Sequence, residues 1–134
     1  MVTMKAIYQG HKHCQVTHGP SGSTIETDAP RDNQGKGERF SPTDLVGAAF
    51  ASCVLTTMAM VAERDGISLN GATAEVEKQM LADPRRIGAL PLRVTMPAAL
   101  TADQRKKLEH TANHCPVHKS LHPELKAEIT FIYL

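Results

Sequence analysis

Residues 41–66 read SPTDLVGAAFASCVLTTMAMVAERDG, and this stretch decides the fold. Its opening predicts the start of a helix. Ser41 can be the N-cap, Pro42 suits the first helical position, and Asp44 lies where the acid of a capping box would lie. Glycine commonly follows the last turn of a helix, so Gly66 predicts the end. The sequence therefore predicts one long, uninterrupted helix.

This helix is apolar on nearly all sides, because residues 45–62 contain no charged side chain. A membrane span needs about 20 predominantly apolar residues. Here Gly47, Ser52 and Thr56 stand among many alanines, without an aromatic belt or basic flanks, which favours a buried core helix. A helix that is apolar all round has to be enclosed, and a chain this short offers little material for that. The pattern therefore also predicts a dimer.

Outside the helix, alternating apolar residues predict strands, and residues 28–40 form a polar loop rich in turn formers. The strands are expected at residues 4–8, 14–18, 23–27, 67–81, 90–96 and 125–133, with a turn at 83–88. A second helix is expected to begin at Thr101 and to be interrupted at Pro116, before a short helix at 117–121. The order of elements predicts an α+β chain with antiparallel sheet, in a single domain of residues 1–134.

The composition of the chain bears on which kinds of partner it could bind and on its compartment. The 134 residues are 41% hydrophobic and carry 15 Lys and Arg against 14 Asp and Glu, which gives no electrostatic case for a nucleic acid or an anionic membrane as partner. The N-terminus lacks the apolar core of a secretory signal, so we expect a cytoplasmic protein. In that compartment the three cysteines are expected to be reduced.

Two cysteines are candidates for chemistry. Cys53 lies in the middle of the apolar helix, where it could be either a small core residue or a nucleophile. Cys115 directly precedes Pro116 at the start of the predicted short helix, where unpaired N–H groups and the helix dipole favour a thiolate. The two lie far apart in the chain, so their spacing does not show whether they meet.

Histidine recurs every fourth residue near the C-terminus, at His110, His114, His118 and His122. On one continuous helix these would form a ligand stripe with Cys115, but Pro116 breaks the continuity. We therefore favour a solvated face and predict no metal site, with a His/Cys site kept as a minor alternative. A second cluster, His11, His13 and Cys14, is expected in a strand, with too few ligands on one face to bind zinc.

The loop before the long helix carries Arg31, Lys36 and Arg39. Such residues are usually solvated. If the loop folds over Cys53, one arginine could stabilise its thiolate and orient an oxygen-rich substrate. Asp44 is most simply a capping acid, and holding that arginine would be a second role.

Two motifs carry a family resemblance: FSPTDLVGAAFASC at residues 40–53 and CPVHKSL at 115–121. Together they resemble the OsmC/Ohr family, the osmotically inducible protein C and organic hydroperoxide resistance proteins. The resemblance covers nearly the whole chain, including the order of its elements, and is greatest to the less characterised OsmC-like branch.

The resemblance implies an intertwined homodimer, in which antiparallel sheets wrap two long central helices. It implies that Cys53 is the thiol that attacks organic hydroperoxides, and less readily hydrogen peroxide, and that Cys115 resolves the resulting sulfenic acid to a disulfide. An external dithiol, lipoyl-type in the organic hydroperoxide branch, would reduce that disulfide, with no bound cofactor.

One position departs from the family pattern. The better-studied branches carry Glu immediately after the helix-start proline, to pair with the catalytic arginine, whereas this chain has Thr43 there and Asp44 next. The departure keeps a second function open: a dimeric protein of the same fold that binds a small ligand or senses redox state without catalysis.

Overall fold

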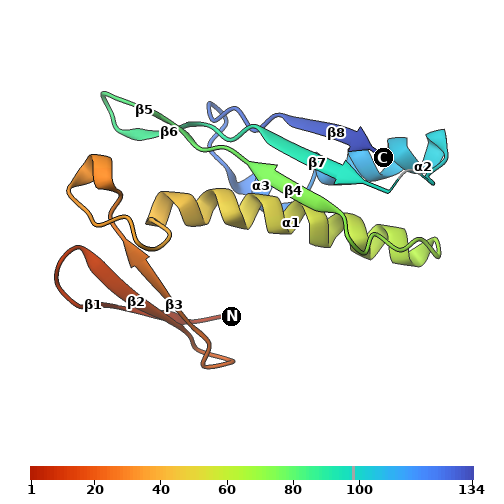
Figure 1. Cartoon of the computed structure of the whole chain (residues 1–134). Coiled ribbons are helices and arrows are strands. Elements are labelled where there is room, and N and C mark those ends of the chain that lie inside the picture. The colour runs from red at the N-terminus through yellow and green to blue at the C-terminus, as the bar shows by residue number, and fades with distance from the viewer. Residues whose placement is uncertain (98) are drawn as a thin grey trace. The chain divides into compact units, whose positions relative to one another are not determined.

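The computed structural model describes residues 1–97 and 99–134 (Figure 1). Contacts divide the chain into two compact units, the N-terminal unit of residues 1–46 and the C-terminal unit of residues 47–134. The elements in order are β1 (Met4–Tyr8), β2 (His13–His18), β3 (Thr24–Asp28), a 3-10 turn (Arg31–Asn33), α1 (Pro42–Arg64), β4 (Thr73–Val76), β5 (Gln79–Leu81), β6 (Arg86–Ala89), β7 (Leu92–Met96), α2 (Ala102–Ala112), α3 (Pro116–Ser120) and β8 (Ile129–Tyr133). The mixed α+β prediction is confirmed, and a single domain over residues 1–134 stays a prediction.

The capping box predicted for α1 is present. The Ser41 backbone N–H donates to Asp44 Oδ2 at 2.9 Å, and the Asp44 N–H donates to Ser41 Oγ at 3.0 Å. At the other end, Gly66 adopts a left-handed φ of 71°, which residues with a Cβ rarely tolerate. Both ends of α1 therefore lie where the local sequence predicts them.

In the N-terminal unit, β1, β2 and β3 form an antiparallel sheet in that order. The register gives the sheet an apolar and a polar face. The mainly apolar face carries Met4, Ala6, Tyr8, Cys14, Val16 and Ile25 together with His18 and Thr27, and the mainly polar face carries Lys5, His13, Gln15, Thr17, Glu26 and Asp28 together with Ile7. One expectation is wrong: His11 lies in the turn between β1 and β2 with a left-handed φ of 54°, so it does not share a strand with His13.

In the C-terminal unit, β7 is the central strand of a sheet ordered β4-β7-β8. β4 runs antiparallel to β7, as predicted, but β8 runs parallel to β7. The prediction of wholly antiparallel sheet is therefore wrong at this pair. The reason is the connection: α2 and α3 lie between β7 and β8 in the chain, and such a crossover returns the chain in the same direction.

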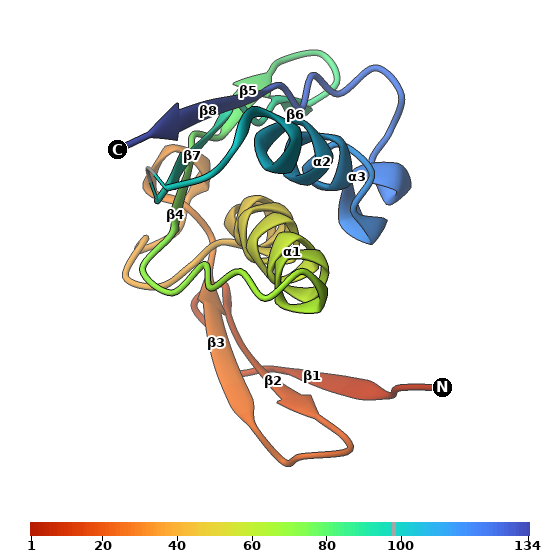
Figure 2. The ribbon, with the colours of Figure 1, turned by 90° about the vertical axis from the view of Figure 1, so that its right-hand side faces the viewer.

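The two long helices, α1 and α2, lie on the same side of this sheet (Figure 2). Alternate residues of β7 point into the core between them, because successive side chains of a strand face opposite sides. The buried set comprises Leu92, Val94 and Met96 from β7, Phe50, Val54, Met58 and Ala62 from α1, and Leu108 and Ala112 from α2. This core fixes the middle of α1 against the sheet.

Two boundaries differ from the predictions. The turn expected at 83–88 is present but ends at residue 85, and residues 86–88 belong to β6, which forms a two-stranded hairpin with β5. The last strand begins at Ile129 rather than at Leu125, although Lys126 still forms an isolated bridge to Ala89.

By length and composition, α1 could cross a membrane, with a mean hydropathy of 2.0 over its most apolar 18 residues. The core helix of a soluble protein meets the same criterion, and five residues of α1 are buried in this chain. The opposite stripe of α1 is exposed, at Ala49, Ser52, Thr56 and Met60. The C-terminal unit thus encloses only one side of this apolar helix.

Candidate functional site

The first candidate residue, Cys53, lies in the middle of α1 and is half-buried. Its Sγ is 3.8 Å from Oγ1 of Thr57, one turn further along the helix. The neighbouring turns of α1 are held in the core by Phe50 and Val54, so the backbone that carries Cys53 is fixed. A rigid helix therefore presents a partly accessible thiol.

The second candidate, Cys115, is the N-cap of α3 and is fully buried. Its Sγ accepts the backbone N–H of His118 at 3.4 Å, as a capping side chain does. Pro116 occupies the first turn, where its missing N–H costs nothing and its fixed φ suits the helix. The predicted position of Cys115 at a helix start is confirmed.

The pKa of the Cys115 thiol is nevertheless raised, and the largest cause is burial, which penalises the charged thiolate. The N–H groups of His118 and Val117 lower the pKa but do not overcome burial. The helix start therefore favours the thiolate in the expected direction, but burial outweighs it and the net pKa of Cys115 is raised.

The side chain of Cys53 is a further cause of the raised pKa at Cys115, by hydrogen bonding and by charge. Such effects act only at short range, so the fold places near one another two thiols that the spacing alone did not connect. Both belong to the C-terminal unit.

A pair of aromatic rings joins α1 to α3. The rings of Phe50 and His118 are 5.6 Å apart and tilted by 55°. Nε2 of His118 donates to the backbone oxygen of Ala127 at 3.3 Å. His118 thus joins α3 to the chain before β8.

The other histidines do not continue this arrangement. The rings of His110 and His114 stack at 4.2 Å, and Nδ1 of His114 donates to the His110 carbonyl at 2.7 Å. In the part of the chain that the structure describes, no group of three or more His, Cys, Asp or Glu residues could hold a metal ion.

The arginines predicted to support the site lie in the N-terminal unit. Arg31 donates from Nε to the Lys36 carbonyl at 3.2 Å. Arg39 donates from Nε to Glu26 Oε2 at 3.4 Å. Asp44 caps α1, as the simpler interpretation of its position predicts.

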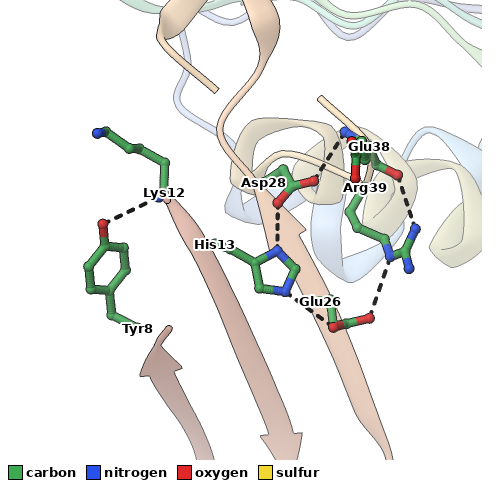
Figure 3. Close-up of polar contacts among 7 residues, drawn as sticks. All are labelled: Tyr8, Lys12, His13, Glu26, Asp28, Glu38 and Arg39. Atoms are coloured by element: carbon green, nitrogen blue, oxygen red, sulfur yellow. Dashed lines mark hydrogen bonds and ion pairs between the residues drawn. The ribbon is translucent and has the colours of Figure 1, made fainter. Parts of the chain in front are cut away.

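Sequence reasoning missed a polar network on the sheet of the N-terminal unit (Figure 3). His13 lies directly opposite Asp28 on the neighbouring strand, and Glu26 is two residues before Asp28. Nδ1 of His13 is 2.5 Å from Asp28 Oδ1, and Nε2 is 3.1 Å from Glu26 Oε1. The feature that could have revealed this network is the pairing of the two strands. Residues directly opposite one another on neighbouring strands lie on the same face of a sheet, and so do residues two apart along one strand.

Comparison with known proteins identifies the family. The model of the OsmC family, described as OsmC-like protein, matches residues 35–130. A crystal structure from Psychrobacter arcticus 273-4 is 44% identical with a TM-score of 0.93, and the match covers 98% of this chain and 96% of that chain. That protein is provisionally named an osmotic stress induced and detoxification response protein. No curated protein matches the chain.

More distant structures share the fold. An organic hydroperoxide resistance protein OsmC from Legionella pneumophila is 20% identical with a TM-score of 0.79, covering 98% of this chain and 96% of that one. An organic hydroperoxide resistance protein from Elizabethkingia anophelis is 16% identical with a TM-score of 0.77, covering 100% of this chain and 96% of that one. The family model spans most of the chain and the 44% identical structure spans nearly all of it, so the chain belongs to the OsmC/Ohr family.

Proposed function

We propose that this protein is a cysteine-based thiol peroxidase that reduces organic hydroperoxides, and hydrogen peroxide less well. The observation that carries the proposal is the short-range effect of Cys53 on the Cys115 thiol, which puts two cysteines from distant parts of the chain near one another. Membership of a family with members named for organic hydroperoxide resistance supports the same reaction class.

The proposed cycle has three steps. The Cys53 thiolate attacks the peroxide, forming an S–O bond and breaking the O–O bond, and the departing alkoxide takes a proton to give the alcohol. The sulfur of Cys115 then attacks the Cys53 sulfenic acid, and the hydroxyl leaves with the Cys115 proton as water. An external dithiol of lipoyl type reduces the disulfide by thiol exchange and is itself oxidised.

The different burial of the two thiols supports the assignment of roles. Cys53 is half-buried, so a peroxide can reach it, whereas Cys115 is fully buried. Burial raises the pKa of Cys115, which keeps it protonated and unreactive toward peroxide until a sulfenic acid forms beside it.

We also propose that the protein works as a homodimer in the cytoplasm. Two apolar surfaces support the dimer: the exposed stripe of α1 at Ala49 and Met60, and the apolar face of the sheet in the N-terminal unit. Burying such surfaces is the usual driving force for association. A reducing compartment would keep both thiols ready for the cycle.

Arg31 and Arg39 remain proposed supports for the Cys53 thiolate. Each guanidinium is delocalised, permanently charged and able to bind a peroxide oxygen or a thiolate. Lysine at either position keeps the positive charge but loses the planar pair of N–H donors of the guanidinium. Comparing Arg31→Lys with Arg39→Lys therefore identifies which arginine supports the thiolate. The variant of the supporting arginine should lose turnover, and the other should keep it.

The deciding experiment is intact mass under denaturing, non-reducing conditions after one equivalent of an organic hydroperoxide, followed by peptide mapping. We expect a loss of two hydrogens mapped to a Cys53–Cys115 disulfide. Cys53→Ser should abolish hydroperoxide consumption, whereas the control Cys14→Ser should not change it. Unchanged thiols at Cys53 and Cys115, or full turnover by Cys53→Ser, would overturn the proposal.

The second candidate is a dimeric protein that binds a small ligand or senses redox state. The observation that favours it is at the start of α1, where Thr43 follows Pro42 and its Oγ1 is 3.2 Å from Ser41 Oγ. Thr43 has no carboxylate with which to pair an arginine. Slow, stoichiometric oxidation of Cys53 without turnover in excess dithiol would favour this candidate.

A further inference from the structure

A chain of alternating charges crosses the polar face of the N-terminal sheet (Figure 3). It runs from Arg39 to Glu26, where Nε and Oε2 are 3.4 Å apart, and from Glu26 to His13 at 3.1 Å. It ends at Asp28, whose Oδ1 is 2.5 Å from His13 Nδ1. When His13 is protonated, two cations and two carboxylates balance one another.

Asp28 also holds the segment that precedes α1. Its Oδ2 accepts the backbone N–H of Glu38 at 3.1 Å, and its own backbone N–H donates to the Phe40 carbonyl at 3.2 Å. The Asp28 side chain is only 5% exposed. One buried carboxylate thus connects His13 on β2 with residues 29–40, which we call the arginine loop because it contains Arg31 and Arg39.

We propose that His13 is a pH-sensitive positioning residue: when protonated it fastens the arginine loop to the sheet through Asp28 and Glu26, and when neutral it loosens that loop. This role concerns a histidine that lies outside the cysteine pair. It assigns to the N-terminal unit a control over the segment that carries both candidate arginines.

The reason lies in the hydrogen-bonding capacity of imidazole. Both ring nitrogens of His13 face carboxylate oxygens, and both can donate only in the protonated form. Neutral His13 has one donor, so its other nitrogen presents a lone pair to either Glu26 or Asp28. One of the two links is then lost and replaced by repulsion.

The surrounding charges act in both directions. Asp28 and then Glu26 raise the pKa of His13 above its usual value, and partial burial opposes them. His11, Lys36 and Glu38 line a cavity of about 330 Å³ that His13 and Asp28 also border, together with Arg39. Lys36 and Arg39 are cations and Glu38 is an anion, so these neighbours oppose one another, and the largest causes of the raised pKa of His13 are its direct hydrogen bonds to Asp28 and Glu26.

Protonation of His13 and fastening of the arginine loop are linked equilibria. If the pKa of His13 is higher in the fastened loop than in the open loop, protonation must favour the fastened loop by the same factor. If the pKa of His13 differs by about one between the fastened and the open loop, protonation changes the ratio of fastened to open loop about tenfold. The contribution is present at low pH and is lost as pH rises through the pKa of His13 in the fastened state.

The test follows two NMR signals in the full chain. The ring ¹⁵N shifts report the pKa of His13, and exchange of the Glu38 amide, corrected for its intrinsic rate, reports the fastened loop. We expect Glu38 protection to fall about tenfold or more between about pH 5.5 and pH 8.5, with a midpoint at the pKa of His13.

Two variants sharpen the test. His13→Gln should make Glu38 protection independent of pH over this range. The matched control is His18→Gln, because His18 lies on the same strand but is hydrogen-bonded to Ser21 Oγ at 2.6 Å. This control should keep the wild-type profile. Glu38 protection that stays constant in the wild type, or an ordinary pKa at His13, would overturn the inference whether or not the variants fold.

A second readout rests on the proposed function. Turnover of an organic hydroperoxide by wild type and by His13→Gln should show pH profiles that differ around the pKa of His13, with the profile of His18→Gln unchanged. Absence of turnover in all three proteins would count against the peroxidase alone. Glu38 protection that does not change with pH in the wild type would count against the positioning role alone.

Discussion

Replacing Cys115 by alanine or by serine separates its structural role from its chemical one. Cys115→Ala removes the acceptor of the His118 N–H, and losing such a cap costs about 1 kcal/mol. It also removes a fully buried sulfur of roughly methyl size, worth about 1 kcal/mol more. We expect a total loss of about 2 kcal/mol in the free energy of unfolding. Cys115→Ser keeps a capping oxygen, so we expect a loss of about 1 kcal/mol.

Urea denaturation in excess reductant, at one protein concentration, measures both losses against the wild type. Equal losses in the two variants would contradict the capping role of Cys115. After one equivalent of hydroperoxide, both variants should accumulate a Cys53 sulfenic acid that a cyclic 1,3-diketone traps. Continued turnover with the external dithiol at the wild-type rate would refute Cys115 as the resolving thiol.

Three further predictions concern stability and assembly. Gly47→Ala should stabilise the protein by about 1 kcal/mol in urea denaturation, because glycine disfavours helix and the new Cβ would meet Leu90 and Val76 at 3.5 and 3.6 Å; a loss would contradict this. The stability that His13 contributes should be lost as pH rises through its raised pKa, and His13→Gln should flatten that alkaline limb of the unfolding midpoint. Ala49→Arg should yield monomers in sedimentation velocity, with Ala49→Ser remaining dimeric; a dimeric arginine variant would exclude the exposed stripe of α1 from the interface.

The local features of the fold follow from the sequence because they depend on neighbouring residues. Ser41 and Asp44 are three residues apart and cap α1 by contacts within one turn. Thr101 and Gln104 form the predicted second capping box for the same reason. Alternation located most strands, since it reflects the side of the sheet that each residue faces.

The features that sequence reasoning missed depend on contacts between distant segments. The parallel pairing of β7 and β8 follows from the path of the chain through α2 and α3, which alternation within a strand does not specify. The pairing of His13 with Asp28 needs the register of two strands. The proximity of Cys53 to Cys115 needs the packing of α1 against the segment that begins α3.

Cys115 shows how two opposite effects at one atom decide the proposed chemistry. A helix N-terminus favours a thiolate, but it acts through a few N–H groups, whereas burial removes water from every side of the sulfur. Here burial is the larger effect, so the pKa of Cys115 is raised. In the proposed cycle, the buried sulfur of Cys115 therefore stays protonated, and peroxide reacts at the more accessible Cys53.

The different accessibility of the two sulfurs also determines how the disulfide is reduced. An external dithiol must reach one sulfur of the disulfide directly, and only that of Cys53 is partly accessible, so reduction begins there and Cys115 is the leaving thiol.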